Sequence, residues 1–149
     1  MRKIVLVSAA MLLVALATNA ASAGGTLTCG NNMTCHILGP TVSISGPVTP
    51  ANGLSGQTLA TVKGATLTVT DILVGNQDTQ SSCIFAFGNG AASTAFSSPI
   101  LGGVVQPGAT LAINLKTGLT YKENTSISFA VVTLGFSSCA GFVTIIGAF

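Results

Sequence analysis

Short stretches in which apolar and polar residues alternate are the feature that most constrains the fold of this chain. Residues 41–45 read Thr-Val-Ser-Ile-Ser and lie between two Gly-Pro pairs. Successive side chains of an extended strand point to opposite faces, so the valine and isoleucine face one way and the hydroxyls the other. No stretch after residue 23 has the spacing of apolar residues that an amphipathic helix requires. The pattern therefore predicts an all-β chain.

Similar runs recur along the chain between turns rich in Gly, Pro, Asn and Asp, at 57–62, 66–74, 83–87, 100–106, 109–115, 119–121, 126–134 and from 140 to the end. Eight or nine short strands at this spacing predict an antiparallel β-sandwich, Ig-like or jelly-roll-like, in a single domain over 24–149. Within 66–74 the apolar residues change parity at Asp71, which predicts a β-bulge there. Pro107 with Gly108, and residues 122–124, are predicted to close hairpins.

The first 23 residues have the three parts of a secretory signal peptide. Arg2 and Lys3 precede an apolar run over 4–17, and Ala-Ser-Ala at 21–23 supplies a small-residue cleavage site. The apolar run is shorter than the roughly 20 residues that a membrane-spanning helix needs. We expect cleavage after Ala23, and therefore a secreted or cell-surface protein, periplasmic in a Gram-negative cell.

Removal of the leader leaves a chain without net charge. Its charged residues are three basic and three acidic ones: Lys63, Lys116, Lys122, Asp71, Asp78 and Glu123. A balance of this kind gives no electrostatic footprint for nucleic acid or for an anionic membrane surface. A surface normally keeps like molecules apart by charge, so the composition favours a neutral exterior that assembles or contacts a protein partner.

The four cysteines all follow the leader, and an exported protein meets an oxidising environment. They are interpreted as two disulfides, for which three connectivities exist. We favour Cys29–Cys35, around a loop of turn-forming residues, together with Cys83–Cys139. The alternative is a metal site formed by Cys29, Cys35 and the adjacent His36. The gap of five residues between those cysteines is longer than zinc sites use, so we expect no metal.

The residues that carry catalysis are scarce. His36 is the only histidine, the acidic residues fall at turns or strand ends, and no G-x-S-x-G motif is present. We therefore expect no enzyme activity and no cofactor. The segment 75–79 offers oxygen atoms to calcium but contains a single carboxylate, so we interpret it as an Asx-type turn.

The terminal segment 142–149, Phe-Val-Thr-Ile-Ile-Gly-Ala-Phe, resembles the alternating closing strand of chaperone–usher pilins. It departs from their pattern at Phe136 and Ala148, where those subunits carry glycine and tyrosine. The resemblance implies an incomplete sandwich that a neighbouring subunit's strand completes.

These observations predict an exported structural or adhesive protein that assembles or interacts by strand addition. One alternative is a soluble binding module for a sugar, a peptide or an enzyme target, with Tyr121 and Phe96 as contact residues. The other is a small outer-membrane β-barrel, because Val143 and Ile145 share the parity of the terminal Phe149. A barrel needs aromatic girdles, and this chain has no tryptophan and one tyrosine.

Overall fold

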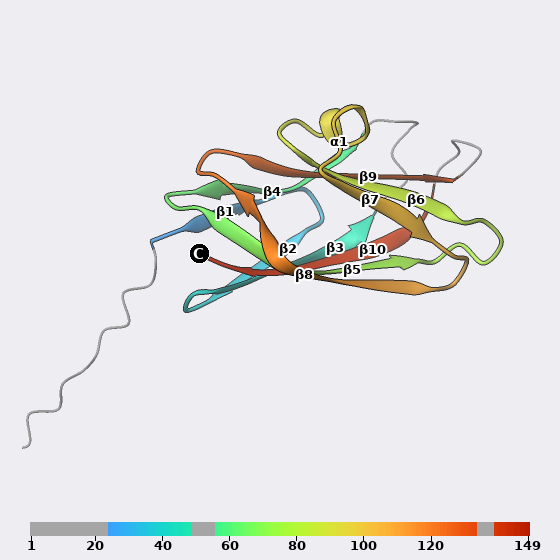
Figure 1. The fold of residues 1–149 in the computed structure, drawn as a ribbon, viewed down its shortest axis with the longest axis horizontal. Coiled ribbons are helices and arrows are strands. Elements are labelled where there is room, and N and C mark those ends of the chain that lie inside the picture. Colours follow the sequence, from blue (N-terminus) through green and yellow to red (C-terminus); the bar gives the residue numbers. More distant parts are fainter. Residues whose placement is uncertain (1–23, 49–55, 134–138) are drawn as a thin grey trace, which may run out of the picture.

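The protein is a sandwich of two antiparallel β-sheets, as the alternating pattern predicts (Figure 1). The computed structural model describes residues 24–48, 56–133 and 139–149. These residues form ten strands and one short helix, and each sheet contains five strands. The predicted signal peptide, residues 1–23, lies outside the described residues.

The two sheets draw their strands from the whole length of the chain. Sheet A has the order β1 (Thr26–Cys29), β4 (Gln57–Lys63), β9 (Ser126–Thr133), β6 (Cys83–Asn89), β7 (Leu101–Val105). Sheet B has the order β2 (Thr34–Leu38), β3 (Thr41–Val48), β10 (Gly141–Ala148), β5 (Leu67–Asn76), β8 (Thr110–Tyr121). The helix α1 (Thr94–Ser97) packs on β6 and β9, on the outer side of sheet A.

The core lies between the inner faces of the sheets. Three phenylalanines of sheet A pack together there, with ring centroids 4.7 Å apart for Phe87 and Phe129 and 6.0 Å apart for Phe85 and Phe87. Sheet B contributes β-branched residues, among them Ile44, Val69 and Ile145. Aromatic rings that meet edge to face over a layer of branched side chains are typical of a well-packed sandwich interior.

The bulge predicted at Asp71 is confirmed. The register between β5 and β8 shifts between Val69 and Asp71, so the apolar residues change parity without leaving the core. The displaced carboxylate is held on the outer face. Thr70 Oγ1 donates to Asp71 Oδ2 at 2.8 Å, and Asn114 Nδ2 donates to Asp71 Oδ1 at 2.7 Å.

The predicted strand list is wrong in two places. The segments β1 and β2, which contain Cys29 and Cys35, are strands that the sequence pattern does not predict. Segments 109–115 and 119–121 form one strand, β8, rather than two. Gly118 adopts a φ of +70°, so the chain irregularity there is absorbed inside the strand.

The two predicted hairpins are also wrong. Pro107 and Gly108 do form a turn, but β7 before it belongs to sheet A and β8 after it to sheet B. Residues 122–124 likewise carry the chain from β8 back to β9 in sheet A. Alternation indicates whether a side chain points inward or outward, and an inward-pointing side chain is compatible with a strand in either sheet. The sequence pattern therefore could not tell a hairpin from a crossover between sheets.

Both predicted disulfide pairings are confirmed. Cys29–Cys35 joins β1 to β2, and Cys83–Cys139 joins the start of β6 to the residues before β10. Two disulfides in an all-β fold are compatible with an extracellular location. Among the described residues no helix is long and apolar enough to cross a membrane.

Candidate functional site

The two lateral sides of the sandwich have the same strand connection, but only one of them is closed by a disulfide. On each side an edge strand of sheet A leads through a short turn into an edge strand of sheet B, as β1 to β2 on one side and β7 to β8 on the other. The Cys29–Cys35 bridge ties the first pair, with Cα atoms 6.1 Å apart. No disulfide joins β7 to β8. The β7/β8 side is the candidate functional site.

The outer edge of β7 has no strand beside it in the described part of the chain. A free edge presents a row of backbone N–H and C=O groups to any extended segment that approaches. Natural edges are usually protected by a charged residue, a proline or a bulge. β7 reads Leu-Gly-Gly-Val-Val and pairs with β6 without a register shift, so it contains none of these.

An apolar hollow of about 400 Å³ lies on the outer face of sheet A beside this edge. Its floor is formed by Ala86 and Gly102, which oppose each other in register and carry no long side chain. Its remaining lining residues are uncharged: Ile84, Phe85, Phe96, Pro99, Ile100, Leu101, Gly103 and Val104. Ile100 and Val104 at its rim are 44% and 46% exposed. The hollow therefore presents an apolar surface directly next to unpaired backbone.

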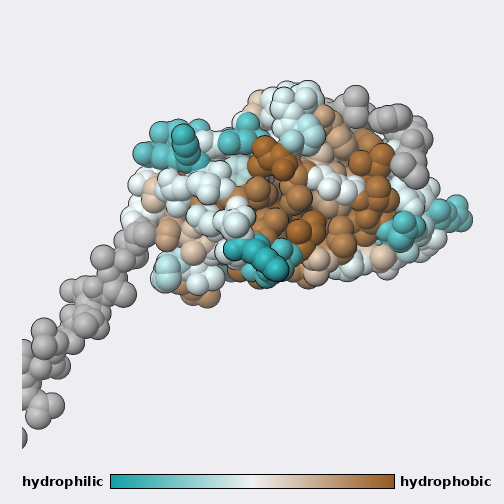
Figure 2. Space-filling view, viewed as in Figure 1, coloured by the Kyte–Doolittle hydropathy of each residue, from teal (hydrophilic) through white to brown (hydrophobic). Residues whose placement is uncertain are grey.

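The core is also incompletely covered where β7 and β8 diverge. The inward-facing side chains of β8, Leu111, Ile113 and Leu115, are only half-buried although they pack against the core. Gly103 on β7 adds no side chain to cover them, and a Cβ there would meet the ring of Phe85 at 2.9 Å. Figure 2 shows the result as a hydrophobic area below α1, over β7 and the neighbouring part of β8.

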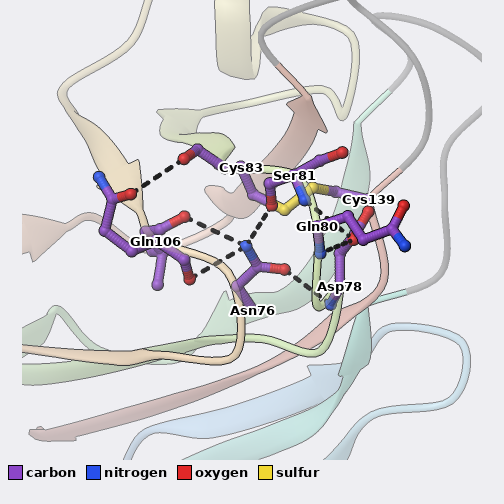
Figure 3. Close-up of a disulfide and its surroundings, with 9 residues drawn as sticks. Asn76, Asp78, Gln80, Ser81, Cys83, Gln106 and Cys139 are labelled. Atoms are coloured by element: carbon purple, nitrogen blue, oxygen red, sulfur yellow. Dashed lines mark hydrogen bonds between the residues drawn. A yellow bond between two sulfur atoms is a disulfide. The ribbon is translucent and has the colours of Figure 1, made fainter.

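One end of β7 is hydrogen-bonded to Asn76, a buried residue at the end of β5 (Figure 3). Its Nδ2 donates to the carbonyl oxygens of Val105 and Gln106, each at 3.2 Å, and to that of Ser81 at 2.8 Å. The Cys83–Cys139 bridge lies beside it, and Cys83 pairs with Val105. The edge strand is thus anchored at its C-terminal end to both sheets.

The loop after Asn76 is the Asx turn that the sequence predicts. Asn76 Oδ1 accepts a hydrogen bond from the backbone N–H of Asp78 at 2.8 Å. Asp78 Oδ1 accepts from the backbone N–H groups of Gln80 at 2.8 Å and Ser81 at 3.0 Å. These backbone donors hold the pKa of Asp78 below its usual range. The carboxylate therefore serves the turn.

The helix α1 forms the border of the hollow and covers a buried hydroxyl. Phe96 lines the hollow, while Ala95 faces sheet A and is fully buried. Ser128 lies beneath, close to Gly88 and Ala95, and its Oγ is buried without a hydrogen-bond partner among the described residues. The sequence pattern predicts no helix after residue 23, so neither α1 nor its position at the hollow was predicted.

The other residues singled out in the sequence lie away from the hollow. Tyr121 is 1% exposed and packs in the core, so its side chain is not a surface contact. Burial raises the pKa of its phenol above the usual value. Cys29 and Cys35 are oxidised to a disulfide, and no group of three metal-ligating side chains occurs among the described residues. His36 lies on the exposed strand β2.

Sequence reasoning named one residue of the hollow, Phe96, as a contact candidate and missed the others, although one signal was present. No charged residue occurs between Asp78 and Lys116, a segment that includes β6, α1 and β7. Within this run β7 has no polar side chain at all, so the outward residues of that strand present an apolar surface if they are exposed. A scan against protein-family models finds no match for this chain, and a search of curated proteins finds no similar sequence.

Proposed function

We propose that this protein is an exported structural or adhesive module that acts by contact with protein partners at the β7 edge. The observation that supports the proposal is the coincidence of an unprotected edge strand with an apolar hollow on the same strand. Strand addition uses both parts, because backbone hydrogen bonds supply affinity and side-chain pockets supply specificity.

Export and neutrality support the same proposal. The leader at 1–23 sends the chain to an oxidising compartment, and two disulfides suit that environment. The mature chain carries equal numbers of basic and acidic residues, so charge does not hold other molecules away. The hollow offers no acid, base or nucleophile to a substrate, which favours an interaction role over catalysis.

Chemical cross-linking of intact cells that produce the protein tests this proposal. The edge variant is Val104→Lys, which places a charge at the rim of the hollow. The matched control is Leu38→Lys, an equivalent change at a side chain that is 78% exposed on β2. We expect wild type and Leu38→Lys to form cross-linked species of high mass in the exported fraction, and Val104→Lys to lose them.

Two results would contradict the proposal. One is an exported wild-type chain that is found only as a free monomer. The other is a Val104→Lys chain that folds and cross-links as the wild type does. The N-terminus of the exported chain is measured in the same experiment, and we expect Gly24.

A further inference from the structure

We infer that the partner at the β7 edge is a second copy of this chain, joined by antiparallel pairing of β7 with β7 of the copy. The inference rests on the proposed function and identifies its partner. A two-fold axis at Gly103 would pair Leu101 with Val105 of the copy, and Gly102 with Val104 of the copy. This is the antiparallel register in which all five residues of β7 find a partner.

In this register the outer face of β7 is complementary to itself. Gly102 and Val104 both face outward. Residues Leu101 and Gly103, which alternate with them along β7, stand opposite Phe87 and Phe85 of β6, and both phenylalanines lie in the core. Val104 of each copy would stand opposite Gly102 of the other and lean over the floor of its hollow. The same contact is made twice, as a two-fold interface requires.

The protein already contains a contact of this kind within sheet B. Phe142 on β10 stands directly opposite Gly75 on β5 in the antiparallel register. The phenylalanine ring occupies the space that a side chain at Gly75 would take. A bulky side chain from a neighbouring strand therefore covers an outward glycine of this sandwich. Among the described strands none lies on the outer side of β7, and a strand added there would give Gly102 such a neighbour.

Charge does not oppose the approach of a second copy. The lining of the hollow and all of β7 are uncharged, and the chain from residue 24 onward has equal numbers of basic and acidic residues. Two copies that present identical faces would otherwise repel each other wherever a charge lies near the two-fold axis. Identical apolar edges without a charge are the arrangement that edge protection normally prevents.

Sedimentation equilibrium of the purified, disulfide-bonded chain tests the inference. Over about 1 μM to 1 mM, which spans weak to moderate affinities, we expect a reversible monomer–dimer equilibrium for wild type and for Leu38→Lys. Val104→Lys should weaken the dimer at least about tenfold, since both Val104 side chains lose their burial. Circular dichroism and unfolding confirm that the variant is folded. The wild-type equilibrium tests the inference even if that variant fails to fold.

A cysteine pair tests the register. Mixing Gly102→Cys chains with Val104→Cys chains should give a disulfide-linked dimer of the two, whereas Val104→Cys alone should give none. Cross-linking of Gly102→Cys with itself would place the axis elsewhere and overturn the register. A wild-type chain that stays monomeric up to about 1 mM overturns self-pairing altogether. If Val104→Lys then still loses its cross-linked species on cells, the partner is another protein and the proposed function stands.

Discussion

The two lateral sides of this sandwich each connect an edge strand of sheet A to an edge strand of sheet B, but only one side is held by a disulfide. At the β1/β2 side the chain passes from sheet A to sheet B through a turn that Cys29–Cys35 closes, and Met33 packs inward against the core. At the β7/β8 side the chain passes between the sheets through Pro107 and Gly108, and no disulfide joins the strands. The first side is closed by a disulfide, whereas the second has no disulfide and leaves β8 side chains half-buried beside the apolar edge strand β7.

The difference indicates that one side of the fold is built for stability and the opposite side for interaction. A short edge strand contributes little core of its own, so a disulfide is an economical way to hold it. On the opposite side the hydrogen bonds of Asn76 hold only one end of β7. The length of β7 toward Leu101 is left with a backbone that can take another strand. The following predictions break or sharpen this contrast, in order of decreasing effect.

Removing each disulfide separately should give the largest changes in the free energy of unfolding. Loss of the 56-residue link in Cys83→Ala/Cys139→Ala should lower the free energy of unfolding by about 4 kcal/mol. Loss of the six-residue link in Cys29→Ala/Cys35→Ala should lower it by about 2 kcal/mol and speed amide exchange in β1 and β2. Urea unfolding measures both. A larger loss of stability for Cys29→Ala/Cys35→Ala than for Cys83→Ala/Cys139→Ala would contradict the expectation that the longer link stabilises the fold more.

Substitution of Asn76 should loosen the anchored end of β7. Asn76→Ala removes a buried amide whose two N–H groups lie within hydrogen-bond distance of three carbonyl oxygens and whose oxygen accepts one bond, at a cost of about 3 kcal/mol. Gln77→Ala, at the exposed neighbouring position, is the control and should change stability by less than about 0.5 kcal/mol. Equal effects in urea unfolding would show that the amide does not anchor the strand.

Alkaline pH should destabilise the protein through Tyr121 at the buried end of β8. Burial raises the pKa of this phenol, so the folded state keeps a proton that the unfolded state releases above about pH 10. Unfolding then releases a proton, and stability falls as pH rises through this range. Tyr121→Phe should remove that part of the decline. A variant with the same alkaline slope as wild type would contradict the burial argument.

The buried hydroxyl beneath α1 should give the smallest effect. Ser128→Ala removes a hydroxyl that has no partner and should raise the free energy of unfolding by about 1 kcal/mol. Ser126→Ala, two residues earlier on the same strand, breaks the 2.9 Å hydrogen bond to Thr61 and should lower it by about 1 kcal/mol. Changes of the same sign in thermal unfolding would refute the contrast.

Much of the fold could be predicted from the sequence because strand alternation reports burial directly. The sandwich class, the bulge at Asp71 and both disulfide pairings follow from local patterns and from cysteine spacing. The turns at Pro107 and at 122–124 were placed correctly. The prediction that each joins two paired strands was wrong, because each connects a strand of one sheet to a strand of the other. Which sheet receives a strand depends on contacts between distant segments, and alternation contains no information about them.

Most of the candidate site could not be predicted, for a related reason, and only Phe96 among its residues was named from the sequence. Gly102 and Val104 look like ordinary strand residues, and their position becomes informative only when β7 is known to be an edge strand. Tyr121 is a contact candidate in the sequence because it lies at a predicted connection, and the loops of a sandwich readily support binding. The register of β5 with β8 places it opposite Leu67, inside the core.

Amide hydrogen exchange on wild-type protein, at concentrations below and above the onset of association, tests the central contrast most directly. Our account predicts that the amides of β7 gain protection as concentration rises, whereas those of β1 and β2 do not change. Protection that appears in β1 and β2 instead, or in no strand while the protein associates, would contradict the assignment of the β7/β8 side as the interaction surface.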